Sequence, residues 1–164
     1  MTVTILPFTP ERAPLFDSLN RSWIEELFTL EQKDIDILTQ PQRYIIDTGG
    51  EVWFGAVDGQ IVGACALIVE SDGIVEFSKL GVDKAARGKG VARALLQHCK
   101  RRAAERGAHT LRIYTNTKLA PANALYVSEG FEVAEMTPAQ RQYYQRVDIM
   151  YDLPLTEAVA QQRA

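Results

Sequence analysis

Residues Lys79–Leu96 read "KLGVDKAARGKGVARALL", and this stretch decides the fold. A strand-like segment ends near Val82, and a helical pattern begins at Val91, with Gly88 and Gly90 between them. The first N–H groups of a helix have no intrahelical acceptor, and the helix macrodipole adds positive charge there. Glycine lets a ligand approach the backbone closely. The turn is therefore either a flexible charged turn or a site for an anion, with phosphate or pyrophosphate as the natural ligand.

Two known phosphate-binding loops do not fit this turn. A nucleotide-triphosphate loop requires G-x-x-x-x-G-K-[ST], a pattern that the sequence lacks. A dinucleotide-binding loop requires a third glycine three residues after the second, where Arg93 stands. The latter loop also belongs to a parallel, doubly wound sheet, which the segments upstream contradict.

Those upstream segments are three apolar runs within residues 51–82, "EVWFGAVD", "IVGACALIVE" and "GIVEFSKLGV". The connections between them contain Asp58-Gly59 and Asp72-Gly73. Asp-Gly between β-rich runs is a strong hairpin signal. Residues 51–82 are therefore expected to form an antiparallel meander of three strands.

Helical patterns precede the meander. The first follows a short strand, with Thr9 as the expected N-cap and Pro10 at the first helical position. The second has a capping-box pattern from Thr29 to Gln32 and stops before Pro41.

After the glycine-rich turn, helical and strand-like patterns alternate. A helix stops at Gly107, a strand follows over about 109–116, and a second helix stops at Gly130 before two last strands. The order predicts an α/β (α+β) protein with a mixed, mostly antiparallel sheet of about six to seven strands flanked by about four helices. The length of 164 residues suggests one domain over residues 1–155, with a tail over 156–164 that could form a frayed helix.

The charge is unevenly distributed. The net charge is −3, yet residues 84–106 hold eight Lys and Arg against one acid, a local +7, so the remainder carries about −10. An acidic chain makes nucleic acid an unsuitable main partner. The basic segment fits one small anionic ligand, or simply a solvated helix face.

Other sequence features narrow the class further. Cys65 and Cys99 lie in apolar patterns, which predicts buried free thiols, and they are too few for a zinc site or a disulfide framework. We therefore expect no metal. No signal peptide and no apolar run near the length of about 20 residues needed for a membrane helix is found, which predicts a cytoplasmic protein without a membrane partner.

The turn matches another pattern, [Q/R]-x-x-G-x-[G/A], through Arg87, Gly90 and Ala92. The strand "VEFSKLGV" precedes it, and "ALYVSEGF" (residues 124–131) follows about 35 residues later. On these motifs, and on the order of elements along nearly the whole chain, the sequence resembles the GNAT superfamily of N-acetyltransferases. The resemblance implies the GNAT fold, acetyl-CoA as co-substrate, and direct acetyl transfer within a ternary complex to a primary amine of a small molecule or peptide.

The resemblance also implies the residues that bind the cofactor. They come from the strand end, the glycine-rich turn and two asparagines: Leu80, Gly81, Val82, Arg87, Gly88, Lys89, Gly90, Val91, Ala92, Arg93, Asn116 and Asn123. Many relatives carry an asparagine where Leu119 stands here, and it bonds the pantetheine arm. Asn116 and Asn123 could replace it, or could be a turn residue and a surface helix residue.

Two catalytic residues are implied in the same way. Glu76 stands where the family often places its base, acting directly or through water. It alternates in phase with Ile74, Leu80 and Val82, so we expect it to face partly apolar surroundings, where burial would raise its pKa toward a useful range. The alternative is an ordinary exposed strand glutamate. Tyr126 matches the tyrosine that protonates the leaving thiolate in many relatives, or it packs on the core.

The amine acceptor stays open. In the family its recognition comes largely from segments that correspond here to residues 20–45 and 135–150. The first holds an acidic stretch, which could attract a cationic amine or be a solvated surface. The second could supply Tyr143 and Tyr144 to a pocket wall, or simply begin a strand.

Three functions remain to be compared. The first is catalysis, the second is a non-catalytic CoA-binding sensor or partner module, which the Leu119 departure allows, and the third is nucleic-acid binding by the basic helix, which the acidic remainder makes poor. A homodimer is common among relatives and is not readable from this sequence.

Overall fold

The computed structural model describes residues 2–155, and the predicted tail over 156–164 lies outside them. The chain divides into two compact units, which are described separately. The first, called unit 1, holds residues up to Val69 together with Phe77–Cys99. The second, called unit 2, holds Glu70–Glu76 and the residues from Lys100 onward. A single domain over residues 1–155 stays a prediction.

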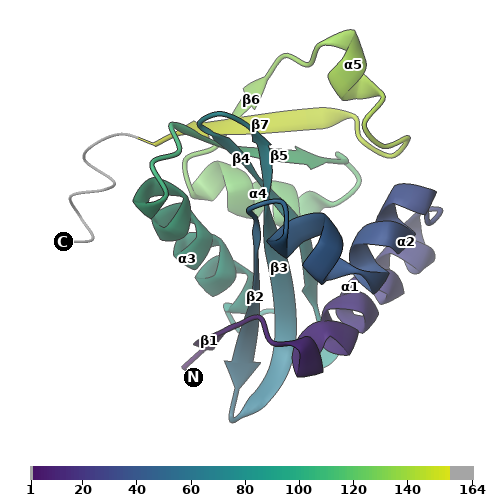
Figure 1. The fold of residues 1–164 in the computed structure, drawn as a ribbon, viewed down its shortest axis with the longest axis vertical. Coiled ribbons are helices and arrows are strands. Elements are labelled where there is room, and N and C mark those ends of the chain that lie inside the picture. The colour runs from purple at the N-terminus through teal and green to yellow at the C-terminus, as the bar shows by residue number, and fades with distance from the viewer. Residues whose placement is uncertain (1, 156–164) are drawn as a thin grey trace. The chain divides into compact units, whose positions relative to one another are not determined.

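Seven strands form one sheet of order β1-β2-β3-β4-β5-β7-β6 (Figure 1). The strands are β1 (Thr4–Pro7), β2 (Glu51–Val57), β3 (Gln60–Ser71), β4 (Ile74–Val82), β5 (Thr110–Thr115), β6 (Glu132–Ala134) and β7 (Ile149–Pro154). The β4–β5 pair is parallel, whereas the pairs β1–β2, β2–β3, β5–β7 and β6–β7 are antiparallel. The mixed, mostly antiparallel sheet predicted from the sequence is confirmed.

The helices also follow the predicted order. They are α1 (Ala13–Leu27), α2 (Gln32–Thr39), α3 (Val91–Glu105), α4 (Ala120–Ser128) and the short α5 (Pro138–Arg141), with brief turns η1 (Pro10–Arg12), η2 (Gln42–Ile46) and η3 (Lys84–Ala86). The α/β class is therefore confirmed, and α5 and the π-helical turn η2 are additions that the sequence patterns did not indicate. Within residues 2–155 no helix is both long and apolar enough to cross a membrane.

In unit 1 the β2–β3 hairpin turns at Asp58-Gly59, as predicted. Both residues have positive φ, 51° and 79°, which is the backbone that a two-residue type I′ turn requires. The helices α1 and α2 lie side by side (Figure 1). Their apolar faces and strands β2 and β3 share a core that includes Phe16, Ile24, Leu38 and Phe54.

One of the two expected helix caps is confirmed in position and the other is wrong. Thr9 is the N-cap of the 3₁₀ turn η1 with Pro10 at its start, as predicted, although its side chain makes no capping hydrogen bond. The capping box of α2 is formed by Glu31 and Asp34, not by Thr29 and Gln32. The helix begins at Gln32, and the Asp34 carboxylate accepts from the Glu31 N–H at 3.0 Å, so the N-cap lies two residues later than the pattern suggested.

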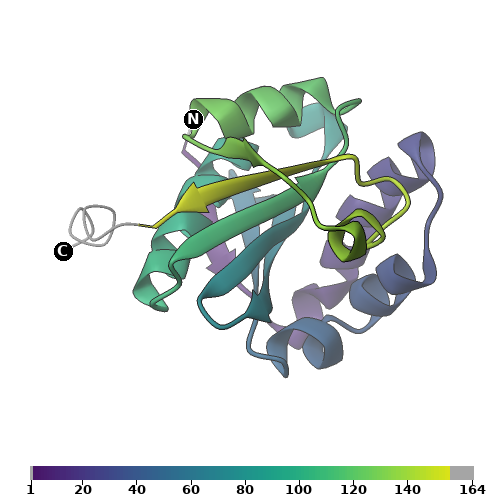
Figure 2. The same cartoon turned by 90° about the horizontal axis from the view of Figure 1, so that it is seen from above.

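In unit 2 the two faces of the strands carry different chemistry. Arg112 of β5 pairs in register with Glu76 of β4 and with Asp152 of β7, so these side chains share one face. Tyr151 is next to Asp152 in β7 and therefore points to the opposite face, where helix α4 packs. Figure 2 shows α4 on one side of β5 and β7 and α5 on the other.

Candidate active site

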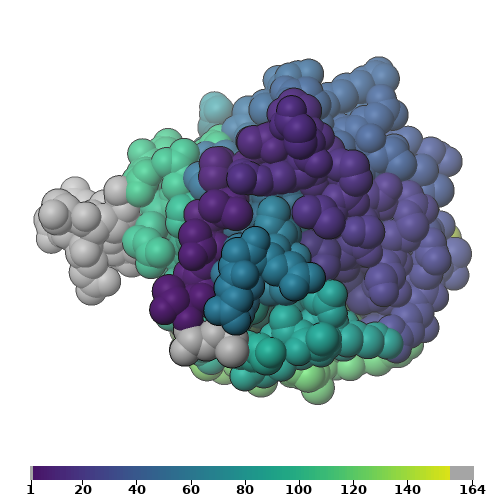
Figure 3. All heavy atoms as spheres, turned by 90° about the horizontal axis from the view of Figure 1, so that it is seen from below, coloured from purple at the N-terminus to yellow at the C-terminus, as the bar shows by residue number. Residues whose placement is uncertain are grey.

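The glycine-rich turn of unit 1 is well ordered by local bonds. The Asp83 carboxylate accepts from the Ala85 N–H at 2.9 Å and starts η3. Gly88 and Gly90 then adopt φ values of 80° and 82°, a backbone that glycine alone adopts at little cost. The Gly90 carbonyl accepts from the Ala94 N–H at 3.0 Å, which opens α3. The teal segment near residue 90 lies on the face seen in Figure 3.

The space above the two glycines is open. A Cβ atom added to Gly88 or Gly90 would meet no atom of the described residues within 4 Å. Arg87, Lys89 and Arg93 are all exposed beside it. A helix N-terminus, an open backbone and three cationic side chains fit the pyrophosphate of acetyl-CoA.

Val91 has a different role from its neighbours. Its side chain is 1% exposed and packs over the strands, because a Cβ atom at Gly55 or Gly63 would lie 3.0 or 2.7 Å from Val91 Cγ1. These strand glycines therefore let the start of α3 approach β2 and β3 closely. Of Val91, only the backbone could face a ligand, whereas Ala92 is partly exposed.

The end of β4 also lies in unit 1. Gly81 is buried against α1, and a Cβ atom there would come within 2.5 Å of the Leu19 carbonyl oxygen. Leu80 and Val82 are partly exposed. The Arg87 guanidinium Nε donates to the Val82 carbonyl at 3.4 Å, so the turn and the strand end are joined.

One assumption about β4 is wrong. The alternation that was to place Glu76 in phase with Leu80 and Val82 does not run unbroken. Lys79 has a φ of 53°, in the left-handed region, and this interrupts the two-residue period of a strand. Glu76 is nevertheless buried.

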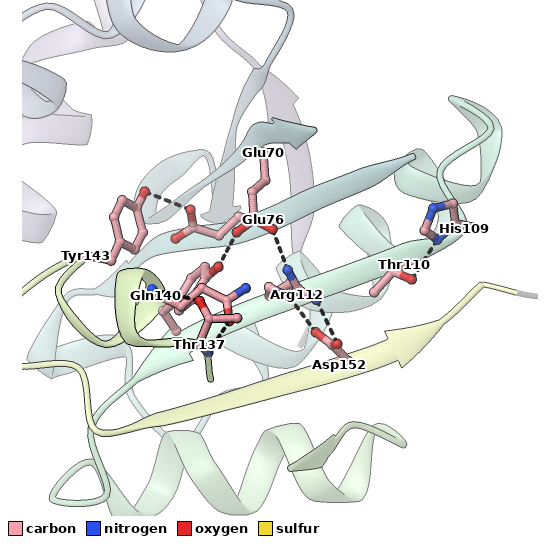
Figure 4. A network of polar contacts seen from close by, with 10 residues as sticks. Glu70, Glu76, His109, Thr110, Arg112, Thr137, Gln140, Tyr143 and Asp152 are labelled. Carbon is pink, nitrogen blue, oxygen red and sulfur yellow. Dashed lines mark hydrogen bonds and ion pairs between the residues drawn. The ribbon is translucent and has the colours of Figure 1, made fainter. Parts of the chain in front are cut away.

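Glu76 lies in unit 2 and is 4% exposed. The Tyr143 hydroxyl donates to its Oε1 at 2.9 Å (Figure 4). Burial disfavours a charged carboxylate, whereas a donated hydrogen bond stabilises it. The ordinary exposed strand glutamate is thus excluded, and a buried, hydrogen-bonded carboxylate is found instead.

Tyr126 lies on the opposite face of unit 2 from Glu76. Its side chain is 5% exposed, and its ring centroid lies 6.2 Å from that of Phe131 and 5.8 Å from that of Tyr151. This packing agrees with the alternative that Tyr126 is an aromatic residue of the core. A role toward the thioester sulfur stays a prediction.

The two candidate asparagines are both engaged within unit 2. The Asn116 amide donates to the Arg146 carbonyl at 2.7 Å. The Asn123 amide donates to the carbonyls of Asn116 and Leu119, at 3.0 and 2.7 Å, and accepts from the Tyr151 hydroxyl at 2.7 Å. These bonds hold the start of α4 to β7, and a bond to the pantetheine arm stays a prediction.

A polar cluster beside Glu76 was not anticipated from the sequence. Arg112 binds Asp152 through two bonds, of 2.7 and 3.0 Å, and also pairs with Glu70, which accepts from the Tyr114 hydroxyl (Figure 4). The hydrogen bonds to Asp152 are the main reason that the pKa of Arg112 is raised. Burial, with the Glu70 carboxylate, raises the pKa of Tyr114. The register of β5 and β7 joins Arg112 to Asp152, and Glu70 comes from β3. The bonded residues are about 40 positions apart, so no local sequence pattern reveals this cluster.

The acidic stretch within residues 25–36 is largely occupied by ion pairs of unit 1. Asp34 is buried against Lys79 at 2.7 Å, and Glu26 pairs with Lys84 at 2.9 Å. The two cysteines of unit 1 are buried thiols that form no disulfide, as predicted, with their Sγ atoms 3.6 Å apart. Among residues 2–155 no group of three or more His, Cys, Asp or Glu side chains could hold a metal ion.

Known proteins share both the sequence pattern and the fold. An acetyltransferase (GNAT) domain model matches residues 48–133. Streptothricin acetyltransferase of Escherichia coli is 28% identical over 142 residues, which cover 80% of each chain. Human N-acetylaspartate synthetase is 30% identical over 112 residues, 68% of this chain but 35% of that protein, so the chain spans about a third of its length.

Solved structures agree with the fold. A GNAT-family acetyltransferase of Staphylococcus aureus superposes with a TM-score of 0.84 at 18% identity, covering 94% of this chain and 100% of that one. The PaiA N-acetyltransferase of Thermoplasma acidophilum, solved in complex with coenzyme A, has a TM-score of 0.71 at 14% identity, covering 94% and 99%. The family model spans more than half of the sequence, and it includes the glycine-rich turn, Glu76 and Tyr126. The chain therefore belongs to the GNAT acetyltransferases.

Proposed function

We propose that this chain is an N-acetyltransferase that moves the acetyl group of acetyl-CoA to a primary amine of a small molecule or peptide. The observation that carries the proposal is the glycine-rich turn at the start of α3. It leaves open space above Gly88 and Gly90 and presents exposed cationic side chains beside a helix N-terminus. In a GNAT chain this is where the pyrophosphate would bind, with Leu80–Val82 offering backbone groups to the pantetheine arm.

The reaction would be a direct attack within a ternary complex. The amine nitrogen bonds to the acetyl carbon as the carbon–sulfur bond breaks. Glu76 takes the proton of the amine, directly or through water, and Tyr126 gives a proton to the leaving thiolate. That second transfer is uphill, because a phenol has a pKa near 10 and a cysteine-like thiol about 8.5. A backbone N–H of residues 80–82 would stabilise the charge that develops on the thioester oxygen.

The names of two relatives suggest acceptors to test. They mention N-acetylaspartate and streptothricin, which point to aspartate and streptothricin as the amines. Both belong in an acceptor panel, together with diamines, other amino acids and peptides. A cytoplasmic location and a homodimer stay predictions.

Thiol release from acetyl-CoA over this panel tests the proposal. We expect release with at least one amine, and a strong loss in Glu76→Gln and Tyr126→Phe. Cofactor binding without release for any amine would overturn it and favour a non-catalytic CoA-binding module. Leu119 and the engaged amides of Asn116 and Asn123 make that module the second candidate. A non-catalytic module would bind CoA tightly in the wild type and equally tightly in Glu76→Gln and Tyr126→Phe.

A further inference from the structure

The Tyr143 hydroxyl reaches Glu76 from a distant part of the sequence. Tyr143 follows α5, 67 residues after Glu76, and donates to Oε1 at 2.9 Å. Its ring is held on two sides, with centroids 4.9 Å from Tyr114 and 4.7 Å from Tyr144. Figure 4 shows Tyr143 and Glu76 facing one another on the same side of the strands. The phenol is therefore fixed in place by packing rather than by the hydrogen bond alone.

The Tyr143 phenol is the donor in its bond with Glu76. Burial raises the pKa of Tyr143 far above its ordinary value of 10.0, and the negative charge of Glu76 adds to the effect. The hydroxyl therefore keeps its proton at neutral pH. A donor of this kind stabilises the charged form of its acceptor.

Two other titratable side chains on the same face of unit 2, both from β5, bind other partners. Arg112, its register partner in β5, directs its guanidinium to Asp152 and Glu70. The Tyr114 hydroxyl also goes to Glu70, at the end of β3. The bond from Tyr143 differs from these because it reaches Glu76 itself.

We propose that Tyr143 is a positioning residue for the base Glu76. It fixes the direction of the carboxylate through Oε1 and favours its ionised form, so that Glu76 is ready to take a proton at a lower pH. The proposal rests on the proposed function, in which Glu76 is the base. It also links the base to residues 135–150, the segment expected to recognise the acceptor.

The pH dependence of kcat/KM tests this in Tyr143→Phe. The substitution keeps the ring packing and removes the donor. A hydrogen bond to a charged group is worth enough to move the acid limb of the profile up by about one pH unit, an activity loss of about tenfold below that limb. Tyr144→Phe is the matched control, since it removes the neighbouring hydroxyl and should leave the acid limb in place. An unmoved limb in Tyr143→Phe would overturn the proposal.

A second measurement does not depend on turnover. The side-chain carboxyl carbon of Glu76, assigned by Glu76→Gln in ¹³C-glutamate-labelled protein, reports its titration by NMR. We expect the carboxylate to titrate at higher pH in Tyr143→Phe than in the wild type, and identical titrations would overturn the proposal. Absence of acetyl transfer by the wild type would overturn the proposed function instead, and the NMR shift would still decide whether Tyr143 stabilises the ionised carboxylate.

Discussion

The Lys79 Nζ atom lies 2.7 Å from Asp34 Oδ1, and their side chains are 2% and 0% exposed. The other oxygen of Asp34 accepts from the Glu31 N–H and completes the capping box of α2. One carboxylate thus closes the first turn of a helix and holds the strand residue whose backbone is left-handed. A non-glycine residue keeps a left-handed backbone only where its surroundings hold it in place. For Lys79, the buried ion pair with Asp34 is such a contact.

Breaking this pair should be costly. In Lys79→Met the Asp34 carboxylate stays buried without its cationic partner, so we expect the free energy of unfolding to fall by about 3–5 kcal/mol. The double variant Lys79→Met with Asp34→Leu leaves no buried charge but loses the Asp34 bond of the capping box. Its loss of unfolding free energy should therefore be smaller than the sum of the Lys79→Met loss and the loss from the missing cap. Urea denaturation of the wild type and of these two variants measures both costs.

The matched control is the exposed pair of Lys84 and Glu26, whose side chains are 62% and 48% exposed. Lys84→Ala should change stability by no more than about 0.5 kcal/mol, because water and salt screen such pairs. A loss in Lys79→Met as small as in Lys84→Ala would contradict the importance of the buried pair.

Gly90→Leu should weaken cofactor binding more than folding. The added side chain meets open space in the described part of the chain, so its folding cost is mainly the left-handed backbone, about 1–2 kcal/mol. The same side chain would occupy the space proposed for the pyrophosphate. We expect the CoA dissociation constant, measured by calorimetry, to rise at least about tenfold, or 1.4 kcal/mol.

Gly107 offers a matched comparison for this substitution. Its φ is 79°, and a Cβ atom there also meets no described atom within 4 Å, but it ends α3 instead of opening it. Gly107→Leu should cost similar folding stability and leave CoA affinity unchanged. Equal losses of CoA affinity in the two variants would make the turn at Gly90 a structural feature only.

Alkaline pH should destabilise the protein through three tyrosines, of which Tyr151 is buried and the other two are partly buried. Burial raises the pKa of Tyr114, Tyr143 and Tyr151 above the ordinary 10.0. The unfolded chain then loses these protons before the native chain does, so their contribution is full below pH 10 and is lost as pH rises through the native values.

The slope should reach about 1.4 kcal/mol per pH unit for each tyrosine that stays protonated. Urea denaturation at about pH 9 and about pH 11 measures it. Tyr143→Phe should reduce the slope, whereas an unchanged slope would show that this phenol ionises as readily in the native protein as in the unfolded chain.

Much of the fold could be read from the sequence because its signals are local. The Asp58-Gly59 turn needs only two residues with positive φ, and the order of elements follows from periodicity and from the glycines that end helices. The predicted cap of α2 was wrong because both Thr29 and Glu31 could serve as the N-cap. The local pattern does not decide between them, and packing determines which residue begins the helix.

The candidate site could be predicted only in part, because some of its contacts join residues that are far apart in the sequence. The glycine-rich turn is continuous in sequence, so its pattern could be recognised. The left-handed backbone of Lys79 depends on a partner 45 residues away, and the Tyr143 bond to Glu76 spans 67 residues. Neither has a local pattern, because strand register and burial bring the partners together. From the sequence, Tyr143 could be named only as an aromatic residue within the expected acceptor segment, not as a partner of Glu76.

Tyr126→Phe separates catalysis from packing. The phenyl ring keeps its contacts with Phe131 and Tyr151, so the melting temperature and the CoA dissociation constant should stay near those of the wild type. Loss of the proton donor should lower kcat about 100-fold, the lower end for general acid catalysis. An acetyl thioester of a CoA analogue with a more acidic thiol should lose less, because its thiolate leaves with less need of a proton. If kcat is unchanged, or falls equally for both thioesters, Tyr126 is a core aromatic residue and the proton comes from another group.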